Sequence, residues 1–338
     1  MEELQQKIDL EEKLANRNEA SMVLELTAAF VNIFTAICGN LLVCWTIFRY
    51  PRLRSTSNLF IACLAASDVL ISVLGFPFII AVLLTGRWPF NKALCDFEGF
   101  TLTVFGAFSL LTMTLTAIAR YLKVSRPLLH RKIYSKRNIC LSVAVAFIIS
   151  STFPVIVISK NAFTFHPGKY ICIFDCDKLG VPMCLTVQGI LIITCFGPIV
   201  CCHIGIFRSV RQHNVRLATS KEAPSREKTP NMQVDDMKVT KLLFSIVIAF
   251  AFCWSPLIVI DGMGLWTGHY WMPREVYMTS TYLACYSSSV NPVIYGIFNN
   301  QLRREFRKIF RCNRHRMHCV QPTTYEMRKT KDWLKRAF

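Results

Sequence analysis

Residues 95–124 read CDFEGFTLTVFGAFSLLTMTLTAIARYLKV, and this stretch decides the fold. Between Glu98 and Arg120 it carries no charge, and a run of that length crosses a bilayer as a helix at about 1.5 Å per residue. Its many glycine, serine and threonine residues let helices pack closely in lipid. The stretch therefore predicts a central membrane helix, with Arg120 as a functional charge at its end.

The rest of the 338-residue chain repeats this apolar pattern. Its residues are 53% hydrophobic and its mean hydropathy is +0.36, which is typical of a membrane bundle. Long apolar segments occupy residues 23–48, 58–84, 94–124, 138–158, 180–207, 239–265 and 276–298. Because lipid offers backbone groups no partners, each predicts a spanning helix, and the fold class is an all-α, seven-transmembrane helix bundle.

The net charge of +18 is unevenly placed. Most lysines and arginines fall in the segments around residues 49–54, 120–137 and 208–241 and after residue 300, which are all on one side of the predicted membrane. The positive-inside rule then places the N-terminus outside and the C-terminus in the cytoplasm. The charge indicates contact with the lipid bilayer of the plasma membrane, and it argues against nucleic acid as a partner.

The ends of the chain differ from its middle. Residues 1–22 are acidic and polar and predict an extracellular N-terminus without a signal peptide, before the seven-helix membrane domain at 23–298. Residues 299–312 alternate apolar and basic side chains and predict an amphipathic helix on the inner leaflet, followed by a cytoplasmic tail at 313–338. Cys312 is a candidate for lipidation, and residues 208–236 predict a flexible inner loop.

Polar residues inside the apolar segments are the first functional candidates. Asp68 is a carboxylate at membrane depth, and Ser109, Ser288 and Asn291 offer oxygens on other segments. Together they predict a site for a small hard cation such as sodium, and the alternative is a polar cluster that only holds helices together. Among the 15 cysteines, Cys95, Cys172 and Cys176 lie on the outer side, which predicts one disulfide and one free thiol.

Prolines interrupt three of the segments. Pro256 follows Trp254, Pro292 follows Asn291, and Pro198 lies in the fifth segment. Each removes a helical hydrogen bond and predicts a kink, which can be purely structural since proline is common in membrane helices.

Several motifs occur in one order along the chain. They are GN at 39–40, LAASD at 64–68, Cys95, RY at 120–121, CWSP at 253–256 and NPVIY at 291–295. From about residue 28 to residue 312 the chain resembles the rhodopsin-like, class A G-protein-coupled receptors. The resemblance implies a receptor and not an enzyme, with a heterotrimeric G protein, arrestin and receptor kinases as partners, an extracellular small molecule as ligand, and Asp68 as a sodium ligand. It also implies activation and coupling roles for Leu110, Arg120, Tyr121, Pro198, Asp236, Phe250, Trp254, Pro256, Asn291, Pro292 and Tyr295.

Within that class the chain is similar to melatonin receptors. The likeness rests on YSKRN at 134–138, HPGKYICIF at 166–174 and FAFCWSPL at 250–257. It implies a Cys95–Cys172 disulfide, a free Cys176, and Phe174 as the aromatic that stacks on the ligand. Val155 and Cys176 stand where that family carries its two polar ligand anchors, which argues against melatonin itself.

Two further positions restrict the ligand. Leu102 stands where aminergic receptors carry an aspartate, and Cys285 stands where opsins carry the lysine that binds retinal, so no covalent retinal is expected. A small, neutral or apolar, melatonin-like ligand is predicted, with Glu98, Leu102, Phe174, Trp254 and Tyr282 as candidate contacts and Glu98 as a solvated residue or a polar hook. The alternative is an opsin-related or constitutively active orphan receptor.

Ala119 stands where the class usually has an acidic residue before the arginine. We expect raised basal signalling from this exchange, or a G-protein preference different from that of related receptors, with Asp236 as a substitute partner for Arg120. A transporter or channel would need inverted repeats or acidic rings, and an enzyme would need a catalytic cluster inside the spans; the sequence shows neither.

Overall fold

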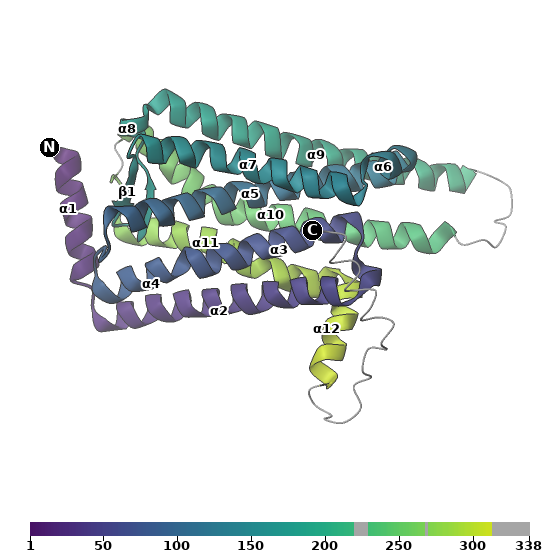
Figure 1. Cartoon of the computed structure of the whole chain (residues 1–338), viewed down its shortest axis with the longest axis horizontal. Coiled ribbons are helices and arrows are strands. Elements are labelled where there is room, and N and C mark those ends of the chain that lie inside the picture. The colour runs from purple at the N-terminus through teal and green to yellow at the C-terminus, as the bar shows by residue number, and fades with distance from the viewer. Residues whose placement is uncertain (220–228, 268–269, 313–338) are drawn as a thin grey trace.

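The computed structural model describes the backbone of residues 1–219, 229–267 and 270–312, and its side chains except at 213–241, 266, 300–301 and 309–312 (Figure 1). The helices are α1 Glu2–Ala15, α2 Glu19–Arg49, α3 Thr56–Leu74, α4 Phe76–Thr85, α5 Lys92–Ser125, α6 Pro127–Ile133, α7 Lys136–Ser159, α8 Cys176–Leu179, α9 Val181–Thr219, α10 Thr229–Thr267, α11 Arg274–Phe298 and α12 Asn300–Cys312. A short 3-10 turn, Pro51–Leu53, follows α2, and strands β1 (Phe163–His166) and β2 (Ile171–Phe174) form one antiparallel hairpin.

The long helices lie side by side as a bundle (Figure 1). Within the described chain, six helical segments are long and apolar enough to cross a membrane. The seventh helix, α11, is more polar, yet it packs against α10 and α2 within the bundle. We refer below to the hairpin end, where α1, β1 and α8 lie, and to the α12 end opposite it (Figure 1).

The second predicted span is divided. Residues 58–84 were expected to form one helix, whereas the structure ends α3 at Leu74 and starts α4 at Phe76. Pro77 lies in the first turn of α4, where its missing N–H group costs nothing, while in a continuous helix its ring would collide with the preceding turn.

Most of the segment predicted as an inner loop is helical. Residues 208–236 were expected to be a flexible loop, but α9 continues to Thr219 and α10 begins at Thr229. Polar residues do not end a helix by themselves, since a helix outside the membrane needs only internal hydrogen bonds and water. The prediction was therefore wrong for most of this segment.

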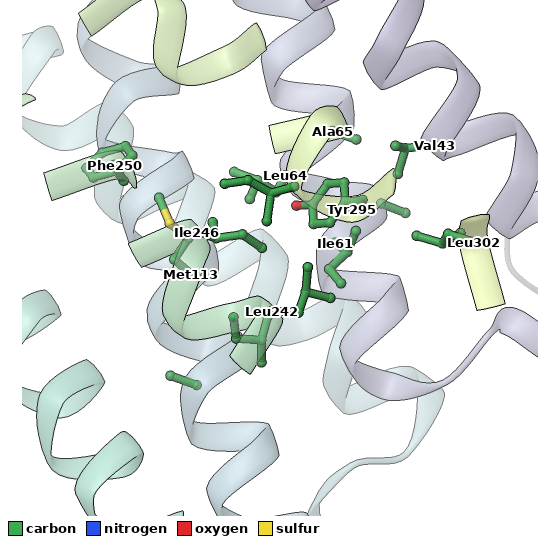
Figure 2. Close-up of a cluster of buried hydrophobic side chains, with 14 of the residues drawn as sticks. Val43, Ile61, Leu64, Ala65, Met113, Leu242, Ile246, Phe250, Tyr295 and Leu302 are labelled. Atoms are coloured by element: carbon green, nitrogen blue, oxygen red, sulfur yellow. The ribbon is translucent and has the colours of Figure 1, made fainter. Parts of the chain in front are cut away.

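The largest apolar cluster fills the bundle toward the α12 end (Figure 2). It joins Ile61 and Leu64 of α3, Met113 of α5, and Leu242 and Ile246 of α10 around the fully buried ring of Tyr295. Figure 2 shows the Tyr295 ring between the helices, with Val43 of α2 and Leu302 of α12 on the side away from Phe250. This packing connects the α12 end to every helix that carries a predicted coupling residue, and Ile199 makes the connection to α9.

Candidate functional site: the hairpin-end cavity and the path to the α12 end

Two disulfides hold the hairpin end. Cys95 at the start of α5 is bonded to Cys172 of β2, which is the pair implied by the resemblance. Cys176 is bonded to Cys184 in α9, so the expectation of a free Cys176 is wrong. The four-residue helix α8 and Gly180 form the turn that brings Cys184 back to Cys176. Cys184 was missed because it follows directly on an apolar span and reads as part of it.

Glu98 lies beneath the first disulfide. It is fully buried, and one carboxylate oxygen accepts a hydrogen bond from the backbone N–H of Cys172 at 3.0 Å. Its other oxygen has no hydrogen-bond partner among the described residues. The expectation of a solvated residue at the mouth is therefore wrong, because the hairpin folds down over α5 and covers this position. Glu98 is placed as a buried acceptor that faces the bundle interior.

A small cavity lies under the hairpin between α2, α4 and α11. Its volume is about 20 Å³, enough for one water molecule. None of the described residues around it is aspartate, glutamate, lysine or arginine. The lining comprises Ala29, Asn32, Ile33, Phe76, Ile79, Tyr170, Thr281, Tyr282 and Cys285. The structure thus shows a neutral site that is almost closed.

The five predicted ligand contacts do not share one surface. Leu102 and Tyr282 belong to the apolar cluster around the cavity, and the Tyr282 hydroxyl donates to the backbone carbonyl of Glu25 at 2.7 Å. Phe174 belongs to another cluster, where its ring meets Phe153 of α7 edge-on at 5.3 Å. Trp254 belongs to the central cluster deeper in the bundle. Of the five, Tyr282 lines the cavity and Leu102 packs in the cluster around it.

The two positions without polar anchors are explained by their surroundings. Val155 on α7 is 55% exposed on the outer surface of the bundle, and Cys176 is locked in the second disulfide. Neither side chain lines the cavity.

Trp254 connects the cavity side to the central cluster. Its ring stacks on Phe250 at 5.4 Å with 20° between the planes, and its indole N–H donates to the Ser287 hydroxyl at 3.1 Å. A Cβ atom on Gly106 of α5 would lie 3.1 Å from the indole, so a larger residue would crowd the ring here. Pro256 lies inside α10 nearly two turns after Phe250, where its missing N–H weakens the helix.

Leu110 and Phe250 lie in the central cluster as the resemblance implies, while Pro198 lies half-buried inside α9. Ile199, beside Pro198, enters the cluster together with Cys195 and Cys202 of α9.

Asp68 joins α3 to α11. It is 3% exposed, and its carboxylate accepts a hydrogen bond from the Asn291 amide at 2.9 Å and one from the Ser288 side chain. The hydroxyl of Ser109, on α5, pairs with the hydroxyl of Ser67 of α3 at 3.1 Å. Asn40 donates to the Ser288 carbonyl at 2.9 Å and leaves its own amide oxygen without a partner among described residues. Side chains of α11 therefore bond to Asp68, while Ser109 bonds to Ser67 and Asn40 to Ser288; Ser67 and Asn40 were not predicted.

Close packing joins α2 to α11 near Pro292. A Cβ atom on Gly39 would lie 2.8 Å from Cβ and Cγ of Pro292, so the glycine permits this approach. Tyr295, one turn further on, is the fully buried ring in the central cluster.

Arg120 and Tyr121 lie toward the α12 end of α5. Arg120 is buried, and the Tyr121 ring packs over Gly205 of α9, where an added Cβ would lie 2.5 Å from the ring. Ala119 is fully buried beside Phe60 and Ile139. Asp236 belongs to α10, but its side chain lies outside the described residues, so its pairing with Arg120 stays a prediction.

Helix α12 follows α11 at an angle to the bundle (Figure 1). Leu302 is buried against the central cluster, while Arg304, Arg307 and Lys308 are exposed. Cys312 is its last residue, and its side chain lies outside the described part of the chain.

Comparison with known proteins agrees with this architecture. A profile of the family described as "7 transmembrane receptor (rhodopsin family)" matches residues 39–295. The chain is 26% identical over 289 residues to melatonin receptor type 1A of Mus musculus, covering 84% of this chain and 80% of the relative. It is 27% identical over 296 residues to melatonin receptor type 1A of Ovis aries, covering 85% of this chain and 78% of that one.

A solved structure supports the fold. The crystal structure of squid rhodopsin superposes with a TM-score of 0.73 at 23% identity, covering 94% of this chain and 92% of that chain. The resemblance to melatonin receptors and the seven-helix fold are therefore confirmed. With the family profile spanning from Gly39 in α2 to Tyr295 in α11, the chain belongs to the rhodopsin family of seven-transmembrane receptors, a family of multi-pass membrane receptors and not of enzymes.

Proposed function

We propose that this receptor binds a small, neutral or largely apolar ligand at its hairpin end and activates a heterotrimeric G protein at its α12 end. The N-terminus and the hairpin then face the extracellular side of the plasma membrane, and α12 lies on the cytoplasmic leaflet. The relatives named for melatonin support a small-molecule ligand. The exposed cations of α12 support its contact with anionic lipid.

One observation carries the proposal: Trp254 of the central cluster bonds to Ser287 of α11, two residues along the chain from Cys285 of the cavity lining. Its indole is held by Ser287 of α11 and its ring lies on Phe250, so a ligand that moves α11 against α10 also moves Phe250. Phe250 packs in one cluster with Leu110 and Tyr295. Since packed cores have discrete arrangements, a small shift at Trp254 can change the arrangement at the α12 end.

The absence of charged side chains from the described lining of the cavity supports a neutral ligand. Leu102 packs so closely on α3–α4 that a Cβ atom on Gly75 would lie 2.8 Å from its Cδ2 atom. An ammonium group would find only hydroxyl, amide and apolar groups among the described lining residues. A ligand of ordinary size needs a few hundred Å³, so binding must enlarge the cavity.

A panel assay tests this proposal. Cells that express the receptor are exposed to indoleamines including melatonin, to neutral lipids, to amines and to peptides, and second messengers are recorded. We expect a response to a neutral small molecule that is lost in Trp254→Ala and kept in Trp45→Ala, whose indole is 62% exposed on the outer face of α2. A response confined to cationic amines or peptides would contradict the proposal.

The oxygens around Asp68 fit a sodium ion, which we propose as an allosteric ligand held by Asp68, Ser109 and Ser288. Replacing NaCl by choline chloride is expected to change basal nucleotide exchange about 5-fold or more, which is the usual size of a coupling between sites. In Asp68→Asn the sodium effect disappears while Asn291 keeps a hydrogen-bond partner. Nucleotide exchange on G protein in membranes measures this effect, with Ser142→Ala as control because Ser142 lies on α7. An undiminished sodium response in Asp68→Asn would contradict the site.

Ala119 is expected to raise basal signalling, so Ala119→Asp should lower it. A carboxylate beside Arg120 would add a charge-assisted hydrogen bond of about 1.5–3 kcal/mol to the inactive arrangement, or a roughly tenfold shift in the equilibrium. Basal second-messenger output at matched surface expression is the measurement. Ala119→Asn is the control, since it adds the same volume without the charge; an equal fall in both variants would contradict the electrostatic account. An Asp236→Asn variant with unchanged basal output would argue against the substitute partner.

The alternative remains an opsin-related or constitutively active receptor. Cys285 lines the cavity and offers a thiol where a Schiff base needs an amine, which supports a receptor without covalent retinal. A visible absorbance band after adding retinal would overturn this. Arrestin and receptor kinases as partners, and lipidation at Cys312, stay proposals for the α12 end.

A further inference from the structure

Helix α1 lies across the hairpin end of the bundle (Figure 1). The acidic N-terminus was expected to be an extracellular segment, and within it Leu10 is 2% exposed and Leu14 is 0% exposed. Leu4 and Ile8 on the same helix are 64% and 44% exposed. α1 therefore has a buried face toward the bundle and an open face.

The two buried leucines contact opposite sides of the bundle mouth. Leu10 packs with Ile260 of α10 and Tyr277 of α11. Leu14 packs in the cavity cluster with Tyr170 of the hairpin and with Leu83 of α4. Tyr170, which shares a cluster with Leu14, also lines the cavity, so α1 packs on a residue of the cavity wall and spans from α4 to the ends of α10 and α11.

A buried ion cluster fixes the end of α1. Arg17 pairs with Glu25 at 2.5 Å, and Arg274 of α11 pairs with the other Glu25 oxygen at 2.9 Å. Arg17 also donates to the backbone carbonyls of Leu14 and Leu83, and Arg274 donates to the Tyr170 hydroxyl at 2.6 Å. Burial, and then the Glu25 carboxylate, raise the pKa of Tyr170, so its phenol stays neutral. The side chains of Arg17 and Glu25 are each 4% exposed.

The turn before α5 is shaped to receive α1. Gly86 adopts a φ of +68°, and a Cβ atom there would lie 3.0 Å from the Cα atom of Ala15. Glycine tolerates both the left-handed backbone and this contact. The backbone of α1 thus lies directly on the end of α4. A separate ion pair, between Lys169 and Asp261, joins the hairpin to α10.

We propose that α1 is a lid over the hairpin-end cavity, fastened by Arg17 to Glu25, and that water-soluble molecules reach the cavity from this end only when α1 leaves. The lid couples to the receptor because Leu10 contacts α10 and α11 together, the two helices that Trp254 and Ser287 also join. Movement of α10 against α11 then weakens the contacts of Leu10, and release of α1 frees the ends of α10 and α11 that Leu10 had joined. This inference does not depend on the identity of the ligand.

Cys285 provides a native probe under the lid. It lines the cavity, and the four cysteines at the hairpin end are held in disulfides. Intact cells that express the full chain are treated from outside with a charged, membrane-impermeant methanethiosulfonate reagent. Mass spectrometry of the Cys285 peptide then gives the rate of labelling. In Leu10→Asp and Arg17→Gln we expect labelling at least about tenfold faster than in the unchanged receptor.

Ile8→Asp is the matched control, since it adds the same charge to the exposed face of α1 and should label at the unchanged rate. Hydrogen exchange of the α1 amides shows whether the lid has left, and Leu10→Asp/Leu14→Asp releases it if one substitution does not. If the α1 amides exchange freely and Cys285 labels no faster, the lid is refuted. Equal labelling of Cys285 in the unchanged receptor and the double variant refutes it as well.

Discussion

Cys172→Ser is expected to cost the receptor about 4–5 kcal/mol of unfolding free energy, which follows from the loss of chain entropy when a bond between residues 77 apart is removed. The same substitution removes the constraint that holds the N–H of Cys172 on Glu98. A buried carboxylate without that partner adds to the cost. The thermal midpoint of detergent-solubilised receptor, followed by thiol-reactive fluorescence, measures the fall.

The second disulfide is the control for this prediction. Cys176 and Cys184 are only 8 residues apart, so the entropy model assigns their bond about 2.5 kcal/mol. We therefore expect Cys176→Ser/Cys184→Ser to lower the midpoint by roughly half as much as Cys95→Ser/Cys172→Ser. Equal losses would show that strain or local packing, and not loop closure, determines the contribution of both bonds.

Glu25→Ala is expected to destabilise the receptor by about 3–5 kcal/mol, because it leaves two buried arginines without their shared carboxylate. Arg17 keeps its carbonyl partners and Arg274 keeps the Tyr170 hydroxyl, but neither of these neutralises a charge. Without the shared carboxylate, the guanidinium groups of Arg17 and Arg274 repel each other. The midpoint of thermal unfolding at matched detergent and salt is the measurement.

Glu19→Ala is the matched control, since Glu19 lies in the first turn of the same helix and is exposed. Its loss should be within about 0.5 kcal/mol of zero. A double variant, Glu25→Ala/Arg274→Ala, should recover part of the stability lost in Glu25→Ala, because it removes one of the unpaired charges. Purely additive losses would indicate that the two side chains do not interact.

The bundle could be predicted from the sequence because its physical signal is strong and local. A chain in lipid must satisfy its backbone within each segment, so length and apolarity suffice to place helices. Asp68 and Asn291 could be associated for a related reason, since polar side chains in apolar helices seek each other. The break before Pro77 carries an equally plain signal, and the unbroken span was predicted because hydropathy alone does not detect it.

The hairpin end was predicted least well, because its structure depends on contacts between distant segments. Glu25 is a carboxylate inside a predicted span, and the reasoning applied to Asp68 would have made it a candidate functional residue. Its partners Arg17 and Arg274 lie 8 and 249 residues away, so the sequence does not reveal the pairing. Leu10 and Leu14 are four residues apart, the spacing of one helical face, within a segment whose overall composition is acidic. Burial of Glu98 depends on where the hairpin folds, which no local pattern contains.

The polarity of α11 has a consequence for how the chain enters the membrane. Its tyrosine, serine and asparagine side chains bond mainly to α2 and α3: Tyr286 to the Ala28 carbonyl, Ser289 to Asn32, and Asn291 to Asp68. In lipid alone these groups would lack partners, so α11 gains little from inserting by itself. We expect it to enter the bilayer late in synthesis, against helices that are already in place. Substitutions in α2 that remove these partners would then reduce the membrane insertion of α11, near the other end of the sequence.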